Sequence, residues 1–247
     1  MFAIFRKEIG GFFSTLTGYL VIIVFILVNS LFMWILPGEW NIPESGYASL
    51  DTLFLLSPWI FLFLVPAITM KMISEEKRLG TIELLYSRPV TEREIVYGKF
   101  FASVVLVFLA LLPGVVYYIT VYLTGETPGN LDRGGTLGSF AGLFFLASIY
   151  VSAGIFASSL TGNQAVAFVV SVFICFFLFT GFDSFSYLSG LKKIDETISQ
   201  LGVNEHYKSM SRGVIDLRDL LYFIAGVVIF NEATRLSLLS RKWKKRN

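Results

Sequence analysis

A carboxylate inside a long apolar run near the C-terminus is one side chain of this sequence that could carry chemistry. Glu232 follows Asn231 there, and Arg235 comes one helical turn later. An acid within a membrane-spanning segment can take up a proton or bind an ion. Glu and Arg three residues apart can also pair on one helix face while the guanidinium reaches the membrane surface. The spacing favours a structural pair over a proton or ion site.

The single histidine of the chain, His206, is a second candidate, because imidazole can act as a general acid or base near neutral pH. A catalytic pair would use Asp183 or Asp216, and Arg212 lies in the same polar stretch. No nucleophile or carboxylate stands at a recognisable spacing from the histidine. We therefore expect a surface or packing residue, and an intramembrane enzyme is the least favoured function. Full activity of a His206→Ala variant would exclude that function.

The longest charged segment, residues 75–99, lies between two apolar runs. Thr91 and Glu94 have the spacing of a capping box, which starts a helix firmly. Upstream, Gly80 ends the extension of the preceding span, Thr81 can cap a short helix, and Pro89 ends it. The apolar face expected on this short helix consists of Leu79, Ile82, Leu85 and Tyr86. Such a helix can fill a groove on another protein, and the same pattern also fits a plain connecting loop.

Sequence motifs that bind nucleotides or metals are absent. The one Lys-Ser pair, Lys208 and Ser209, lacks the glycines of a phosphate-binding loop. One His and one Cys, Cys175, provide neither a metal-binding cluster nor a disulfide. The sequence predicts no cofactor bound by this chain, and any energy from ATP has to enter through another protein.

The composition is that of an all-α polytopic membrane protein. Hydrophobic residues make up 55% and charged residues 15% of the 247 positions, and the mean hydropathy is +0.69. A helix crosses the hydrocarbon core with about 20 apolar residues. Six stretches are long enough, and we predict one domain over residues 1–247 with spans near 17–36, 52–73, 97–123, 136–160, 165–182 and 219–239.

Basic residues predict the orientation of the spans. With the N-terminus in the cytoplasm, 14 Lys and Arg residues lie inside and 6 lie outside, which is the bias of inner loops. Both termini and the loop 74–96 are therefore expected in the cytoplasm. The basic pI reflects this clustering, so no nucleic-acid partner is predicted. An amphipathic N-terminal helix should lie on the membrane surface, and residues 183–218 should form short helices on or in the outer leaflet.

Small residues and prolines recur within the predicted spans. A face of small residues lets another helix approach closely, either inside the chain or in a dimer, and the sequence leaves both open. Prolines within spans remove backbone donors and permit kinks. The small residues are Gly134, Gly138, Gly142, Gly154, Ser158 and Gly162, and the prolines are Pro58, Pro66 and Pro113.

The charged segment also resembles a known family. Its pattern E…GT-x-E-LL…PV…I…GK is similar to the signature after the second span of permease subunits of type-2 ABC transporters. The residues that carry this resemblance are Glu76, Gly80, Thr81, Glu83, Leu84, Leu85, Pro89, Val90, Ile95, Gly98 and Lys99. More narrowly, the stretch HYKSMSRGVIDLRDLLYF, residues 206–223, resembles the gliding-motility-associated permeases of Bacteroidetes bacteria.

The resemblance implies a non-catalytic subunit in a bacterial inner membrane. Its loop 74–96 would form a coupling helix on a cytosolic ABC ATPase, which binds ATP and Mg²⁺. A second permease subunit, either identical or a different chain with a large periplasmic part, would complete the assembly. The output would be transport or mechanical work in gliding and the associated secretion. A secondary transporter that uses Glu232 as its proton site is the alternative, and Glu232→Gln should then abolish transport.

Overall fold

The computed structural model describes residues 1–86, 89–125, 131–184 and 200–244, and every regular element in these ranges is helical. Six helices are long and apolar enough to cross a membrane, as predicted. They are Leu16–Ile35, Asp51–Leu79, Glu92–Thr124, Arg133–Leu160, Gln164–Ser184 and Leu217–Ser240. The all-α, six-span architecture is therefore confirmed.

Several of the spans contain more than one helical segment. The elements are α1 (Phe2–Ser14), α2 (Leu16–Ser30) continuing as the π-helix η1 (Leu31–Ile35), α3 (Ile42–Ser45), α4 (Asp51–Thr69), α5 (Ser74–Leu79), α6 (Ile82–Tyr86), α7 (Glu92–Leu111), α8 (Gly114–Thr124), α9 (Arg133–Leu160), α10 (Gln164–Phe176) continuing as the π-helix η2 (Phe177–Gly181), α13 (Val203–Ser211) and α14 (Leu217–Lys244). Span three is divided at Pro113, which separates α7 from α8. Pro58 and Pro66 lie inside α4.

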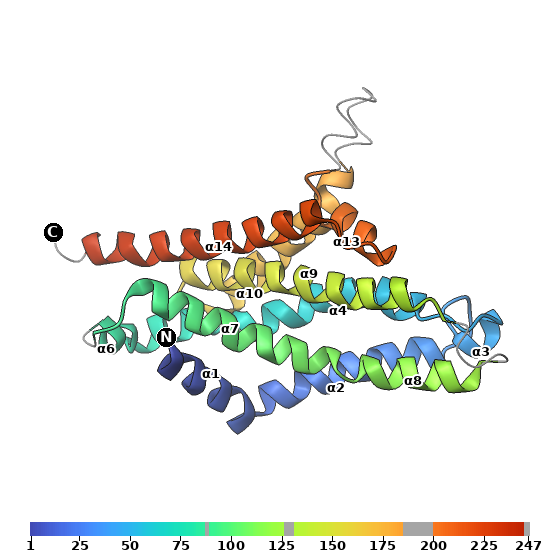
Figure 1. Cartoon of the computed structure of the whole chain (residues 1–247). Helices are drawn as coiled ribbons and strands as arrows, with labels where there is room; N and C mark the ends of the chain where they lie inside the picture. Colours follow the sequence, from blue (N-terminus) through green and yellow to red (C-terminus); the bar gives the residue numbers. More distant parts are fainter. Residues whose placement is uncertain (87–88, 126–130, 185–199, 245–247) are drawn as a thin grey trace.

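The long helices lie side by side, and both chain ends lie at one end of the bundle together with α6 (Figure 1). We call this the α6 end, and the opposite one, which carries α3, the α3 end. Helix α9 occupies the middle of the bundle and packs against α4, α7, α10, α13 and α14. Its small side chains make this central position possible, because they allow neighbouring helices to approach on several sides.

The small-residue face of α9 packs within the chain. A Cβ added to Gly138 would collide with the Met210 carbonyl of α13 and would lie 3.0 Å from the Gly213 Cα. Nearer the α6 end, a Cβ on Gly154 would collide with the Thr69 side chain of α4. Of the two alternatives left by the sequence, the structure has internal packing at these glycines.

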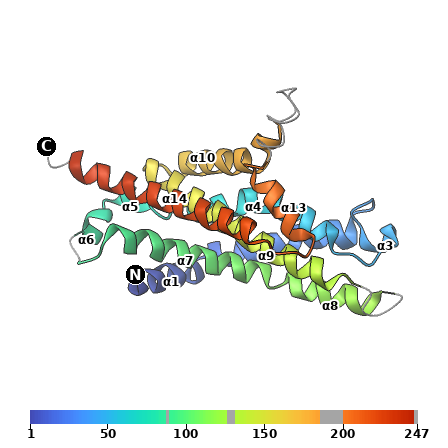
Figure 2. The same ribbon diagram turned by 45° about the horizontal axis from the view of Figure 1, so that its top comes forward.

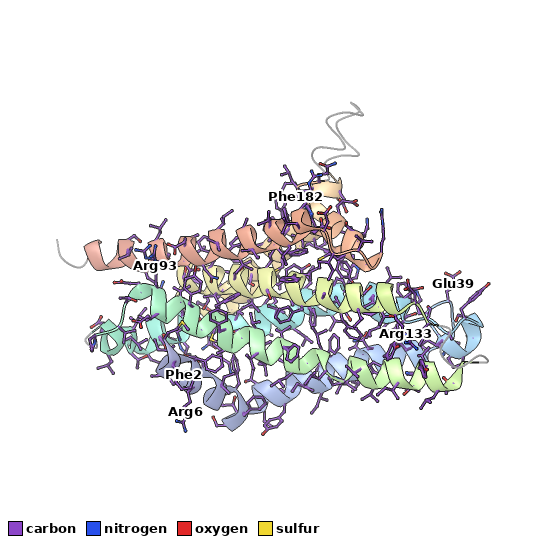
Figure 3. The ribbon with its side chains drawn as sticks, viewed as in Figure 1. Phe2, Arg6, Glu39, Arg93, Arg133 and Phe182 are labelled. Carbon is purple, nitrogen blue, oxygen red and sulfur yellow. The ribbon has the colours of Figure 1, made fainter. Side chains whose placement is uncertain are left out.

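The amphipathic helix α1 lies beside α7 in both ribbon views (Figure 1, Figure 2). Ile4 and Phe12 on its inner side are buried. Phe2 and Arg6 lie on its outer side (Figure 3), and Phe2 is 73% exposed. An apolar side chain exposed on a short helix that leads into a span is typical of a helix that lies in the membrane surface.

Candidate functional site

The end of span two and the connection to span three form two short helices, α5 and α6, at the α6 end. Helix α5 ends at Gly80, whose φ of 72° is in the left-handed region that favours glycine. Helix α6 follows and carries Glu83, Leu84 and Leu85. Two leucines provide the large exposed apolar side chains of the α5–α6 segment: Leu79 at the end of α5 is 62% exposed, and Leu84 on α6 is 66% exposed.

The predicted apolar face of this segment is partly wrong. Leu79 is exposed as expected, but Ile82 is half-buried and packs against the core, and Leu85 is also half-buried. Leu84 takes the exposed position instead. The Tyr86 side chain lies outside the described residues. The left-handed turn at Gly80 rotates α6 relative to α5, so one helical periodicity cannot be carried across the two helices.

The start of α5 is held by a serine of α9. The Ser158 hydroxyl accepts hydrogen bonds from the N–H groups of Ile73 and Ser74, both at 3.0 Å, and donates to the Met70 carbonyl at 2.8 Å. The first N–H groups of a helix have no partner within it, so a serine of another span performs the role of a cap. This contact fixes α5 to the centre of the bundle.

The end of α5 is attached to α9 as well. The Lys77 ammonium donates to the carbonyl of Ser159. The same carbonyl accepts a hydrogen bond from the Ser237 hydroxyl of α14 at 3.1 Å. Helices α5, α9 and α14 therefore meet at one backbone group. Thr81, which follows α5, directs its hydroxyl to the Glu76 carbonyl at 3.5 Å.

An ionic cluster centred on a buried lysine joins α5 to α1 and α7. The Lys99 ammonium is 2.7 Å from Glu8 Oε1 and 2.8 Å from Glu76 Oε1, and its side chain is only 1% exposed. Lys7 contributes a further contact to Glu76 Oε1 at 2.9 Å. Buried ions are stable only when they are paired. These four residues, Lys7, Glu8, Glu76 and Lys99, are called the ionic cluster below.

The cluster also affects the protonation of Lys7. Burial alone would lower the pKa of this ammonium, but its hydrogen bond to Glu76 and the charges of Glu76 and Glu8 outweigh burial and raise the pKa above its ordinary value. Lys7 is thus charged at neutral pH. The cluster therefore contains two cations and two anions when all its members are ionised.

Gly98 is needed for α1 to approach α7. A Cβ at this position would lie 3.1 Å from Ile4 Cβ and from the Met1 carbonyl oxygen. Gly98 and Lys99 thus both serve contacts with α1. Sequence reasoning included them in the charged segment but missed their partners on α1. The presence of Lys7 and Glu8 on a largely apolar helix was the available signal, but it does not identify which distant charges they meet.

The capping box that starts α7 is present. The Glu94 N–H donates to Thr91 Oγ1 at 3.3 Å, and the Thr91 N–H donates to Glu94 Oε2 at 3.0 Å. Pro89 lies two residues before the cap and is exposed. The return of the chain to the bundle therefore starts at a defined residue, as the sequence predicted.

The carboxylate of α14 pairs with two arginines. Glu232 Oε2 lies 2.8 Å from Arg235 on the same helix, and Glu232 Oε1 lies 3.4 Å from Arg93 Nε on α7. Arg93 lies toward the α6 end (Figure 3). The neighbouring Asn231 is buried, and neither of its side-chain polar atoms has a hydrogen-bond partner in the described residues. Glu232 acts here as a link between α14 and α7.

His206 pairs with a carboxylate that sequence reasoning did not select. Its Nδ1 is 2.7 Å from Asp219 Oδ1, its Nε2 is 2.9 Å from the Gln200 carbonyl, and its ring stacks on Tyr222 with centroids 3.8 Å apart. The partner is therefore neither Asp183 nor Asp216, the aspartates of the catalytic alternative. The cause is helical spacing, because α14 presents Asp219 and Tyr222 on one face.

The two aspartates of the catalytic alternative have other partners. Asp183 accepts a hydrogen bond from Asn204 at 2.8 Å, and Asp216 accepts from the Arg218 N–H at 3.0 Å near the start of α14. Arg212 is exposed where α13 ends. Both nitrogens of His206 are occupied and its ring is buried, so the geometry supports a role in packing. Of the predicted outer helices, α13 is described, and Leu191, Ile194 and Ile198 lie outside the described residues.

A tyrosine of α13 compensates for a proline of α4. Pro58 has no N–H, so the Phe54 carbonyl four residues earlier lacks its usual helical partner. The Tyr207 hydroxyl donates to this carbonyl at 2.8 Å in a buried position. Burial raises the pKa of Tyr207, so the phenol stays protonated and can donate. The outer helix thereby completes the hydrogen bonding of span two.

Comparison with known families gives one match. Residues 41–234 match a family model described as ABC-2 family transporter protein. The match covers more than three quarters of the chain and includes α5, α6, Lys99 and α13, whereas α1 and α2 precede it. A search of curated proteins found no significant match.

Proposed function

The chain belongs to the ABC-2 transporter family, and on this premise we propose that α5 and α6 couple ATP hydrolysis by a separate cytosolic ATPase to the work of this membrane subunit. The family and the six apolar helices make the chain a multi-pass membrane permease. Since its sequence has no phosphate-binding loop, ATP and Mg²⁺ would bind to the partner ATPase.

The exposed leucines of the α5–α6 segment are the observation that carries this proposal. Leu79 and Leu84 project from the α6 end beside charged residues of α5, and Glu83 is exposed between them. A short helix with exposed apolar side chains can insert them into a groove of another protein. Because the contact area is small, one or two such side chains would supply much of the binding energy.

The contacts of α5 with other helices would transmit movement of the partner ATPase to the spans. Ser158 joins α5 to α9, and the ionic cluster joins it to α1 and α7. A displacement of α5 therefore has to move these helices or break a buried contact. Coupling between distant sites requires connected elements of this kind.

The proposal is tested by co-purification from the native host. The tagged full-length chain should retain an ATPase with a G-x-x-x-x-G-K-[ST] motif, identified by mass spectrometry. The double variant Glu83→Lys and Leu84→Asp should lose it, because Leu84 would carry a charge into the contact and Glu83 would reverse sign. Val214→Asp is the matched control, since Val214 is 68% exposed but follows α13. Equal ATPase recovery with all three proteins would refute the coupling role.

The setting of the subunit is part of the proposal. Both termini and the loop 74–96 would face the cytoplasm of a bacterium, with the spans in the inner membrane, as the distribution of Lys and Arg favours. A second permease subunit, identical or with a large periplasmic part, would complete the translocation path. Labelling of a Leu84→Cys variant from the cytoplasmic side alone would support this orientation, and its background is low because Cys175 is buried.

The process served by the transporter is proposed to be gliding motility and the associated protein secretion. This rests on the resemblance of residues 206–223 to gliding-associated permeases. These residues include most of α13 and the first part of α14, and the two helices contact each other. Deletion of the gene in a gliding host should abolish spreading on agar, and complementation should restore it. Unchanged spreading would exclude a role in gliding motility, and the chain would then be an ABC permease with another function.

A further inference from the structure

A lateral groove lies between α8 and α9 near the α3 end. Its volume is about 290 Å³, and its lining residues are Val115, Tyr118, Arg133, Thr136, Leu137 and Phe140. Apart from Arg133 at one end, the walls are formed by apolar and aromatic side chains and by Thr136. The Thr136 hydroxyl donates to the Asp132 carbonyl at 2.6 Å, so it needs no polar ligand.

The groove exists because span three changes direction. Pro113 separates α7, which packs along α9, from α8, which makes few contacts with α9. Gly114 leaves space for the Phe140 ring, because a Cβ there would lie 2.7 Å from Phe140 Cε1. Phe140 is held from its other side by an edge contact with Phe54, at 5.1 Å between ring centroids. The floor of the groove is therefore fixed by packing.

The position of the groove places Arg133 at the surface of the membrane. Arg133 is the first residue of α9 and lies toward the α3 end (Figure 3). Trp40 and Tyr47, which are 42% and 79% exposed, lie in the connection that carries α3 at the same end. Exposed Trp and Tyr side chains gather at the level of the lipid headgroups. The apolar part of the groove then extends from Arg133 toward the hydrocarbon.

Arg133 carries a charge that the described residues do not neutralise. No carboxylate among them forms an ion pair with it, and the neighbouring Asp132 side chain instead caps α9 by accepting from the Gly135 N–H at 3.0 Å. The guanidinium is suited to phosphate, since its planar N–H groups can bind two oxygens at once. An apolar groove with a guanidinium at its headgroup end matches an anionic amphiphile.

We propose that this groove binds one acyl chain of an anionic phospholipid, with Arg133 on the lipid phosphate. Its volume is close to the smallest volumes of ligand pockets, about 300 Å³. The groove therefore has room for one acyl chain and leaves the headgroup at the surface. The bilayer is the source of this ligand. The site is independent of ATPase docking, because it lies at the opposite end of the bundle from α6.

The site is tested on the purified full-length chain by lipid exchange and native mass spectrometry. Phosphatidylglycerol and phosphatidylcholine with the same acyl chains compete at equal concentrations. The unaltered chain should retain phosphatidylglycerol with a preference of about fivefold, as expected for about 1 kcal/mol from one basic residue beside an anionic lipid. Equal retention of the two lipids would overturn the proposal.

Two pairs of variants separate the phosphate contact from the groove. Arg133→Gln should remove the preference and still bind a lipid chain, whereas Arg212→Gln, a charge change at α13, should keep the preference. Leu137→Trp should fill the groove and reduce retention of both lipids. Leu123→Trp is its control, because Leu123 is 67% exposed on α8 and does not line the groove. A preference that survives Arg133→Gln, or equal losses in Leu137→Trp and Leu123→Trp, would contradict the assigned site.

Discussion

At the α6 end, helices α1, α5 and α7 are joined by charged side chains, whereas the end of α13 lies directly against the backbone of α9 at Gly138. The ionic cluster joins these helices through the ends of Lys and Glu side chains. At α13, Gly138 and Gly213 bring main-chain atoms together. Long side chains tolerate some relative movement of the helices they join, and backbone contact does not. The proposed docking segment is thus attached through ionic side-chain contacts, in addition to the Ser158 contact with α9.

Loss of the Lys99 ammonium, the central cation of the ionic cluster, should have the largest effect on stability. Lys99→Met leaves Glu8 and Glu76 close together with only Lys7 to balance them. Breaking a buried ion pair by removing one partner costs about 3–5 kcal/mol. We expect a loss of this size in the free energy of unfolding, measured by SDS titration in mixed micelles.

The matched variant removes the two carboxylates together with Lys99 and keeps Lys7, whose side chain is 60% exposed. Replacing Glu8 and Glu76 by Gln together with Lys99→Met leaves no unpaired anion, and neutral replacement of a buried ionic group is often tolerated. Most of the lost stability should return. A triple variant as unstable as Lys99→Met would show that packing around the Lys99 stem matters more than charge.

Overpacking of the glycine face should have the next largest effect. Gly138→Val would place a side chain where the Met210 carbonyl and the Gly213 backbone lie. Extra atoms in a packed core cost about 1–3 kcal/mol, and occasionally more. Thermal unfolding in detergent should therefore begin at a lower temperature, with α13 becoming accessible to proteases.

The control for this substitution is a glycine with free space around it. Gly10 on α1 has no other atom within 4 Å of an added Cβ, so Gly10→Ala should keep or slightly raise stability by favouring the helix. If Gly138→Val and Gly10→Ala behave alike, α13 does not pack on α9 as described.

Loss of one hydroxyl group should test how α13 supports α4. Tyr207→Phe leaves the Phe54 carbonyl buried without a partner, and such a group costs about 1–3 kcal/mol. Tyr150→Phe is the matched control, because the buried Tyr150 hydroxyl has no hydrogen-bond partner in the described residues. Thermal unfolding should show a clear loss for the first variant and little change for the second. The reverse order would contradict the role of Tyr207.

The smallest effect is expected at the link between α14 and α7. Glu232→Gln weakens pairs with Arg235 and Arg93 whose side chains are 30% and 61% exposed, and exposed pairs contribute about 0.2–1 kcal/mol. Stability should fall slightly, and the difference should shrink at high salt. Transport in a reconstituted assembly should persist, whereas its complete loss would revive the proton-coupled alternative.

Local sequence patterns predicted much of the fold but less of the candidate site. Six apolar runs identified the spans, and the spacing of Thr91 and Glu94 identified the start of α7, because both signals lie within one helix. The pair of Glu232 and Arg235 was likewise visible at helical spacing. Arg93, the third member, was not predicted, since it comes from another span.

Contacts between distant segments account for most of what the sequence did not reveal. Lys99 meets Glu8 from 91 residues away, and several other carboxylates were equally plausible partners. Asp219 was not selected as a partner of His206, because the sequence does not show how α13 and α14 pack against each other. The need of Phe54 for a donor follows from Pro58 alone, but the sequence does not say that Tyr207 provides it.

The bond between Tyr207 and Phe54 has a consequence for the order of assembly during synthesis. Its two residues are 153 positions apart, so span two enters the membrane long before the donor for its free carbonyl has been made. The ionic cluster needs nothing beyond Lys99 and can form once three spans have emerged. Chains fold from the N-terminus while they are translated. The ionic cluster of the α6 end can therefore form in a nascent chain before α13 has been synthesised.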